Sequence, residues 1–423
     1  MTSPATGSPR QAVTSADATI VFRQVNRVAI LTLNRPAALN ALDLHMIREL
    51  AGYLEHCRAD PDVAAVVLNS SIEKAFCAGG DVRAIYRTAI DAPHDVAQFF
   101  IEEYRLDLAI HRFAKPVVTI MDGITMGGGM GLAQGAALRI ATERSRLAMP
   151  ETRLGLVPDV GATHFLGAMP IETELYVGLT GAVLGGPDAV QCGLADVCVQ
   201  SASLAGFEQR LEALDLDTAR PSPDPRRAPM NLLTALRDVF AHEPLDTRDA
   251  PITTRQPWIT QHFPAGRSVP EIVASLREAR DGMRAGRAIV LPAFAAAGIP
   301  TQQDAHHETP HAWLTATLDA LLTCSPTLLA VTREALLRGR HMSLPDCFRM
   351  ELGIILRAIE MNDFREGVRA HLIDKDRQPQ WQPATLEAVT AAHVDTFMQP
   401  RWRVEDHPLA TLGNETPPAM PQP

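Results

Sequence analysis

The sequence predicts an α/β protein: a layered core of repeated strand–turn–helix units, followed by a mostly helical C-terminal region. Two observations support this prediction. Up to about residue 215, short apolar runs alternate with stretches whose apolar positions recur at helical spacing. Beyond about residue 268 the helical spacing continues without such runs, and prolines divide the helices from one another.

The expected elements of the core follow one another in a regular order. Asp43 is a plausible N-cap for the first helix, because the apolar residues after it keep helical spacing. The expected elements, in chain order, are a strand at 28–33, a helix at 43–58, a strand at 64–70, a helix from about 82, a helix at about 96–113 and a strand at 116–123, with a further helix and strand after it.

The chain divides into five predicted parts. Nine prolines lie between residues 221 and 270, and such a density breaks regular elements. The two ends are polar and rich in Ser, Thr or Pro, which is typical of disorder. The parts are a disordered tail at 1–17, the catalytic core at 18–215, a Pro-rich insertion or linker at 216–267, the helical region at 268–403 and a second disordered tail at 404–423.

The composition is that of a globular protein with a sizeable core. Of 423 residues, 46% are hydrophobic and 21% are charged, which excludes a mainly disordered or collagenous chain. A net charge of -10 argues against nucleic acid or an anionic membrane as a main partner. No apolar run approaches the roughly 20 residues that span a bilayer, and no signal-peptide segment is recognisable, so we expect a cytosolic location. The six cysteines are scattered without a Cys-x-x-Cys motif, which favours reduced, buried thiols.

Two glycine-rich turns are candidates for a functional site. The first, CAGGD, includes Gly79 and Gly80, and the second, MGGGMG, runs from Met126 to Gly131; both lie between a predicted strand and a predicted helix. Glycine lets a ligand approach main-chain N–H groups closely. The second turn departs from the dinucleotide fingerprint, because Gln134 stands where a Gly or Ala is needed. If both turns direct N–H groups into one cleft, they form an oxyanion hole; otherwise they are tight connections.

Two carboxylates in the segment MPETRLGLVPD are candidates for acid–base chemistry. Glu151 and Asp159 lie on irregular backbone, because Gly155 and Pro158 interrupt any helix. Their neighbours are largely apolar, and burial there would raise a carboxyl pKa toward neutrality. The alternative is a pair of solvated loop acids.

These three motifs in this order resemble the crotonase (enoyl-CoA hydratase/isomerase) family, and so does the stretch VAILTLNRPAALNALDLHMI. The resemblance implies a crotonase-like core over residues 18–215. It is closest to the branch that hydrolyses 3-hydroxyisobutyryl-CoA in valine degradation, through EEYRLDLAI, TCSPT and NDFREGVRAHLIDKDRQPQW. Hydratases carry one catalytic glutamate where this chain has Gly131, a second that matches Glu151, and typically Gly at the position of Asp159.

The resemblance implies hydrolysis of a CoA thioester. The N–H groups of Gly80 and Gly128 would hold the thioester oxygen. Glu151 would act as nucleophile or as general base, and Asp159 would position water or the acyl group. Glu103 would lie near the acyl hydroxyl, and Arg83 near the CoA moiety.

The implied substrate is a small-molecule acyl-CoA, and no metal or redox cofactor is implied. CoA is part of the substrate. The resemblance also admits a homo-oligomer, since many relatives trimerise through C-terminal helices. Two other functions stay open: an enoyl-CoA hydratase or isomerase, and a non-catalytic protein that binds acyl-CoA.

Overall fold

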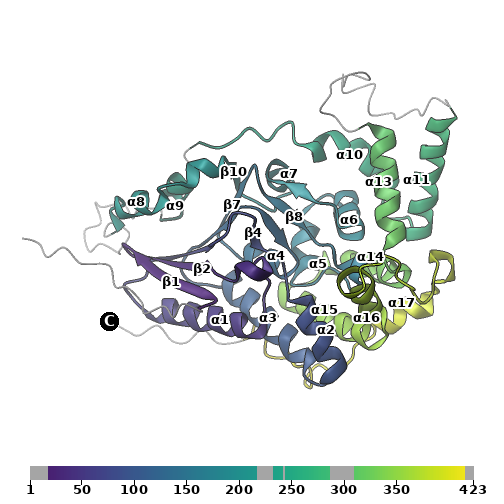
Figure 1. Cartoon of the computed structure of the whole chain (residues 1–423), viewed down its shortest axis with the longest axis horizontal. Helices are drawn as coiled ribbons and strands as arrows, with labels where there is room; N and C mark the ends of the chain where they lie inside the picture. The colour runs from purple at the N-terminus through teal and green to yellow at the C-terminus, as the bar shows by residue number, and fades with distance from the viewer. Residues whose placement is uncertain (1–17, 217–231, 242, 286–308, 415–423) are drawn as a thin grey trace, which may run out of the picture.

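The structure is a computed structural model that describes residues 18–216, 232–241, 243–285 and 309–414. Its N-terminal half is built on two sheets, and its C-terminal half is helical (Figure 1). The tails predicted at 1–17 and at the very end of the chain, 415–423, lie outside the described residues.

The larger sheet has six strands in the order β1-β2-β3-β5-β7-β10. All neighbours pair in parallel except β1 and β2, which form an antiparallel hairpin in which Val25 pairs with Val28. The hairpin turns at Asn26, whose φ of 54° is the left-handed conformation that asparagine tolerates. The strands are β1 (Ile20–Val25), which we did not predict, and β2 (Val28–Leu33), β3 (Ala65–Ser70), β5 (Val117–Met121), β7 (Leu138–Thr142) and β10 (Val197–Val199).

The smaller sheet decides where the site lies. Its strands are β4 (Ala75–Cys77), β6 (Ile124–Met126), β8 (Arg146–Ala148) and β9 (Leu184–Gly185), in that order across the sheet. The first three are parallel, so their carboxyl ends lie at one edge. The two glycine-rich turns and the Glu151 segment follow these three ends in the chain, and the sheet thereby brings them together.

Helices cover the sheets on both faces. On one face α1, α3 and the C-terminal helices share one continuous hydrophobic core, and on the other α8 and α9 cover the six-stranded sheet (Figure 1). Asp43 caps α1 as predicted, because its carboxylate accepts a hydrogen bond from the amide of Met46. The α-helices of this half are α1 (Leu44–Ala59), α2 (Val82–Asp91), α3 (Val96–His111), α4 (Gly128–Gln134), α5 (Ala162–Phe165), α6 (Ile171–Thr180), α7 (Gly186–Gln191) and α8 (Phe207–Glu212).

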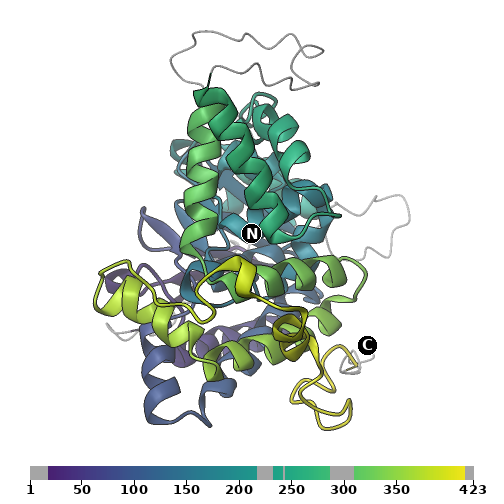
Figure 2. The same cartoon turned by 90° about the vertical axis from the view of Figure 1, so that its right-hand side faces the viewer.

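The C-terminal helices form a second layer against the core. Figure 2 shows α11 and α13 standing side by side at one end, with the later helices wrapped below them. Within the described residues no single helix is long and apolar enough to cross a bilayer, although α13 and α14, bent by 105°, pass that test as a pair. The helices are α9 (Leu232–Phe240), α10 (Pro251–His262), α11 (Val269–Arg284), α13 (Pro310–Thr323), α14 (Pro326–Gly339), α15 (Leu344–Glu360), α16 (Asp363–Val368) and α17 (Ala391–Met398).

Two predictions about irregular segments need correction. The Pro-rich part contains two helices, α9 and α10, within its described residues. Pro251 begins α10 at its first position, where a missing N–H costs nothing, so proline there starts a helix rather than breaking one. The second tail is ordered as far as residue 414, because Leu409 and Leu412 are buried and the Arg349 side chain donates hydrogen bonds to their carbonyls. All six cysteines are buried free thiols, as predicted.

Candidate active site

The two glycine-rich turns lie directly against each other. An ideal Cβ on Gly79 would lie 3.0 Å from the carbonyl oxygen of Met126 and 3.5 Å from the amide nitrogen of Gly128. Gly79 also has a φ of 99°, which L-residues rarely adopt. Side chains are therefore excluded from this contact by both space and backbone conformation.

The amides of Gly80 and Gly128 lie in the same small region. An ideal Cβ on Gly128 would lie 3.4 Å from the amide nitrogen of Gly80. Neighbouring amides make the hydrogen bonds that hold the turns: Asp81 donates to Leu42 and Met130 donates to Gly127. Within the described part of the chain, neither Gly80 nor Gly128 donates a hydrogen bond, so both amides can serve a ligand.

Glu151 closes one side of this region. Its side chain is buried, and its Oε1 atom lies 2.8 Å from the place where a Cβ of Gly127 would be. Its Oε2 atom is buried without a hydrogen-bond partner among the described residues. Burial raises the pKa of Glu151 well above its usual range, and the charge of Asp159 raises it further.

Asp159 is held in place by two elements far away in the sequence. The Tyr104 hydroxyl of α3 donates a 2.7 Å hydrogen bond to Oδ2 of Asp159. Glu351 of α15 accepts hydrogen bonds from the amides of Gly161 (2.8 Å) and Thr163 (3.0 Å), just after Asp159. Burial raises the pKa of Asp159 to about 6, although the hydrogen bond from Tyr104 opposes this shift. Burial likewise raises the pKa of Glu351 to about 7.

Two acids of α3, Glu103 and Asp107, complete the site. Together with Glu151 and Asp159 they form a group of four buried carboxyls that we call the carboxyl cluster. Glu103 faces the second glycine turn, since an ideal Cβ on Gly128 would lie 2.3 Å from its Oε1 atom. Asp107, one helical turn later on the same face, meets Gly131 in the same way, at 2.6 Å from its Oδ2 atom. Burial raises the pKa of both carboxyls well above their usual range, and the charge of Asp159 adds to this effect.

Sequence reasoning proposed Glu103, Glu151 and Asp159 but missed a fourth acid beside them, Asp107, and the two residues that hold the Asp159 loop, Tyr104 and Glu351. The i, i+4 spacing of Glu103 and Asp107 in an expected helix was the available signal for Asp107. Tyr104 and Glu351 had no local signal, because their partners are 55 and about 190 residues away.

Arg83 lies on the surface of α2, apart from the carboxyl cluster, and donates a 3.3 Å hydrogen bond to the carbonyl of Leu372. Arg153, two residues after Glu151, and Arg377 both lie close enough to His371 to lower its pKa, together with burial. We call Arg83, Arg153 and Arg377 the cationic rim. The three arginines gather around the segment that contains His371 and Leu372.

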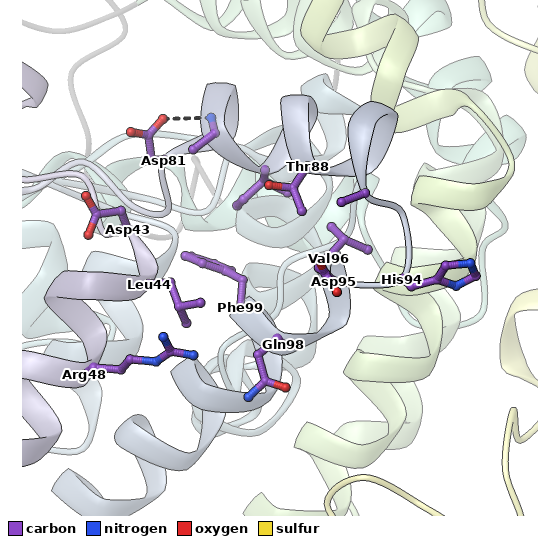
Figure 3. Close-up of a pocket in the computed structure, with 13 residues that line it drawn as sticks. Asp43, Leu44, Arg48, Asp81, Thr88, His94, Asp95, Val96, Gln98 and Phe99 are labelled. Carbon is purple, nitrogen blue, oxygen red and sulfur yellow. Dashed lines mark hydrogen bonds between the residues drawn. The ribbon is translucent and has the colours of Figure 1, made fainter.

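A cavity of about 510 Å³ opens between α1, α2 and α3 (Figure 3). Ile85 and Phe99 line it and are also the side chains nearest to Gly80, at 3.3 Å and 3.1 Å from an ideal Cβ there. The cavity therefore reaches the back of the Gly80 turn and not the buried carboxyls. The wall of this cavity includes three aspartates, and the side chain of Arg48 already donates hydrogen bonds to Glu102 from Nε and Nη2. The cavity is therefore unsuited to phosphate groups.

The described residues include no group of three or more His, Cys, Asp or Glu side chains arranged to hold a metal ion. The site is thus a set of two glycine turns with amides open to a ligand and four buried carboxyls. Such a site can stabilise a negative oxygen and transfer protons.

The chain belongs to the enoyl-CoA hydratase/isomerase family, whose model matches residues 28–398. Two solved structures share its crotonase fold over almost their whole length. One, described as a carnitinyl-CoA dehydratase from Mycobacterium thermoresistibile, is 31% identical, covers 91% of this chain and 97% of its own, and has a TM-score of 0.74. The other, described as an enoyl-CoA hydratase from Rhodobacter sphaeroides, is 33% identical, covers 91% and 98%, and has a TM-score of 0.72.

Within that family the sequence is similar to 3-hydroxyisobutyryl-CoA hydrolases. The mitochondrial enzyme of Gallus gallus is 36% identical over 92% of this chain and 90% of its own. A probable 3-hydroxyisobutyryl-CoA hydrolase of Arabidopsis thaliana is 36% identical over 92% of both chains. The cytosolic location expected from the sequence is contradicted by this comparison, because the relatives from chicken, zebrafish and human are described as mitochondrial. The composition of the N-terminus therefore does not decide the compartment.

Proposed function

We propose that this protein hydrolyses a short-chain 3-hydroxyacyl-CoA thioester, with 3-hydroxyisobutyryl-CoA as the substrate, releasing 3-hydroxyisobutyrate and CoA. One observation carries the choice of hydrolysis over hydration. Glu151 lies beside two open amides, while position 131 leaves no room for a side chain, because Asp107 and Val160 fill the space in front of it. The site thus lacks the first hydratase glutamate.

The amides of Gly80 and Gly128 act on the thioester oxygen. As a nucleophile attacks the carbonyl carbon, this oxygen becomes negative, and two N–H donors at the contact between the turns stabilise it. Removing one such donor typically costs a factor of about 100 to 1,000 in rate.

Glu151 supplies the nucleophile or activates it. In one route its free Oε2 atom attacks the carbonyl carbon, the C–S bond breaks, and water then hydrolyses the mixed anhydride. In the other route the carboxylate takes a proton from water while the water oxygen attacks. In both routes the CoA sulfur leaves as thiolate and takes up a proton. Each route needs Glu151 in its ionised form and needs no metal or redox cofactor.

The carboxyl cluster favours an acyl group that carries a hydroxyl. Oε1 of Glu103, Oε2 of Glu151 and both oxygens of Asp107 are buried without a hydrogen-bond partner among the described residues. An ionised carboxylate only accepts hydrogen bonds, so a ligand that brings donors suits the ionised members of this group. The 3-hydroxyl of the acyl group and a water molecule are such donors, and we assign the hydroxyl to Glu103.

The cationic rim suits the phosphates of CoA. Arg83, Arg153 and Arg377 gather around His371 and Leu372, whereas the cavity between α1, α2 and α3 has an acidic wall. By this proposal the phosphates bind at the rim, and the protein works in valine degradation.

A thiol-release assay tests the proposal. The purified protein is given 3-hydroxyisobutyryl-CoA, 3-hydroxypropionyl-CoA and acetyl-CoA, and hydration of crotonyl-CoA is followed with the same preparation. We expect rapid CoA release from the two hydroxylated esters, slower release from acetyl-CoA, and negligible hydration. Hydration without CoA release would overturn the proposal and favour an enoyl-CoA hydratase.

A further inference from the structure

We propose that Asp107 is a further catalytic residue of the hydrolysis, which binds the attacking water beside Glu151. The inference rests on the proposed hydrolase function. It begins from the space in front of Gly131, where the hydratase resemblance expects a glutamate side chain. An ideal Cβ on Gly131 would lie 2.6 Å from Oδ2 and 2.9 Å from Cγ of Asp107. A carboxyl group from another helix therefore occupies that space.

The position of Asp107 follows from the packing of α3 against α4. Glu103 and Asp107 are one turn apart on α3, and they face Gly128 and Gly131, which are nearly one turn apart on α4. The absence of a Cβ at these places leaves room for the two carboxyls, which any larger residue would displace. The two acids of α3 thus reach the site across the glycines of α4, which have no side chains to block them.

Asp107 is free to bind water, whereas Asp159 is engaged. Both carboxyl oxygens of Asp107 are buried and without a hydrogen-bond partner among the described residues, and its side chain is only 3% exposed. Asp159 already accepts a hydrogen bond from the Tyr104 hydroxyl. Burying an acid with two unused oxygens costs stability, so the arrangement calls for a bound polar partner.

Glu151 is near enough to share that partner. It contacts Gly127, and Asp107 contacts Gly131, four residues further along the same backbone. Both carboxyls also lie close enough to Asp159 for its charge to raise their pKa values. One water molecule between Glu151 and Asp107 then makes a hydrogen bond to each of them. Glu151 then takes one proton from this water as the water oxygen attacks the thioester carbonyl, while Asp107 accepts the other hydrogen bond and fixes the orientation of the water.

Two variants of similar shape test the inference. Asp107→Asn keeps one acceptor oxygen, and Asp107→Leu keeps the branched shape without any acceptor. Glu102→Gln is the matched control, because Glu102 precedes Glu103 on α3 and binds Arg48 outside the site. For each variant, kcat and KM for 3-hydroxyisobutyryl-CoA and the Tm are measured.

We expect Asp107→Leu to lower kcat by about 100-fold or more with KM within about threefold, and Asp107→Asn to recover most of this loss. The Tm of both variants is expected to equal or exceed that of the wild type, since an unpaired buried carboxyl is removed. A kcat of Asp107→Leu within threefold of wild type would overturn the inference, and so would a loss of kcat matched by a lower Tm and weaker binding. If the wild-type protein releases no CoA, the proposed function itself fails, and the two failures are thereby distinguished.

Discussion

The two halves of the active site are supported in different ways. The amide half, at Gly80 and Gly128, is built by neighbouring strands of one small sheet and by glycine turns that directly follow them. The acid half depends on helices: α3 holds Asp159 through Tyr104, and α15 holds the following backbone through Glu351. This difference shows that the pair of open glycine amides forms locally in the chain, whereas long-range contacts position the acids.

The C-terminal helices also hold the loop of Glu151. Gly155, which ends the short helix at Glu151, packs against the carbonyl of Asp363, where an ideal Cβ would be only 2.3 Å away. The amide of Ser325 donates a hydrogen bond to the carbonyl of Thr152. The C-terminal region therefore packs against the core at the loop of Glu151 and helps to hold this residue in place.

The largest effect is expected from removing the reacting acid itself. Glu151→Gln keeps the shape but removes the charge and the nucleophilic oxygen, so kcat should fall by about 1,000-fold or more. Binding of the CoA ester, measured by calorimetry, should remain within a few fold. Turnover near the wild-type rate in this variant would remove Glu151 from the mechanism.

The amide half can be broken by a single methyl group. In Gly128→Ala the new Cβ would lie 2.3 Å from Oε1 of Glu103 and 3.4 Å from the amide nitrogen of Gly80, so it enters the space between the two turns and displaces Glu103 or the turn. We expect kcat to fall by about 100-fold, as for loss of one oxyanion donor. Gly52→Ala on α1 is the control, since no atom lies within 4 Å of its Cβ, and its activity should be unchanged. Full activity of Gly128→Ala would show that this amide does not act on the substrate.

The acid half should be sensitive to a residue that touches no substrate. In Glu351→Gln an NH₂ group replaces one oxygen that accepts from Gly161 or Thr163, and the Asp159 loop loses its anchor. We expect a loss of about 1–3 kcal/mol in the free energy of unfolding and a roughly tenfold fall in kcat. Glu360 lies on the same helix as Glu351 and forms a half-exposed ion pair with Arg401. As the control, Glu360→Gln should lower the free energy of unfolding by less than about 1 kcal/mol and leave kcat unchanged. Equal behaviour of the two variants would contradict the role given to α15.

The smallest effect is a shift in pH dependence. In the proposed mechanism Glu151 acts in its ionised form, and burial and the charge of Asp159 both raise its pKa. The rate should therefore fall as the pH is lowered. This acidic limb of the pH–rate profile should lie at a higher pH than an ordinary glutamate would give. Removing the charge by Asp159→Asn lowers the pKa of Glu151 and should move the limb to lower pH. A limb that stays in place in kcat/KM profiles would show that the two carboxyls are not coupled.

The sequence predicted the locally encoded half better than the other. The turns at Gly80 and Gly128 were recognisable because each motif is contiguous. Glu151 and Asp159 were found for the same reason. Tyr104 and Glu351 were not found, since their role exists only after α3 and α15 pack beside the Asp159 loop.

The predicted fold class was confirmed, and the errors concern prolines and short strands. Pro251 begins a helix, and β6 (Ile124–Met126) forms where only a turn was expected. A strand of three residues carries too little pattern to be recognised, and it exists here because β4 and β8 pair with it on both sides.

The most direct test of the account is product analysis from one substrate. The protein is incubated with 3-hydroxyisobutyryl-CoA, and the products are separated by chromatography and identified and quantified by mass spectrometry. We predict free CoA and 3-hydroxyisobutyrate in equal amounts, with next to no dehydrated ester. An unsaturated CoA ester formed by loss of water, with the thioester intact, would contradict the account, because the carboxyl cluster would then perform hydratase chemistry despite Gly131.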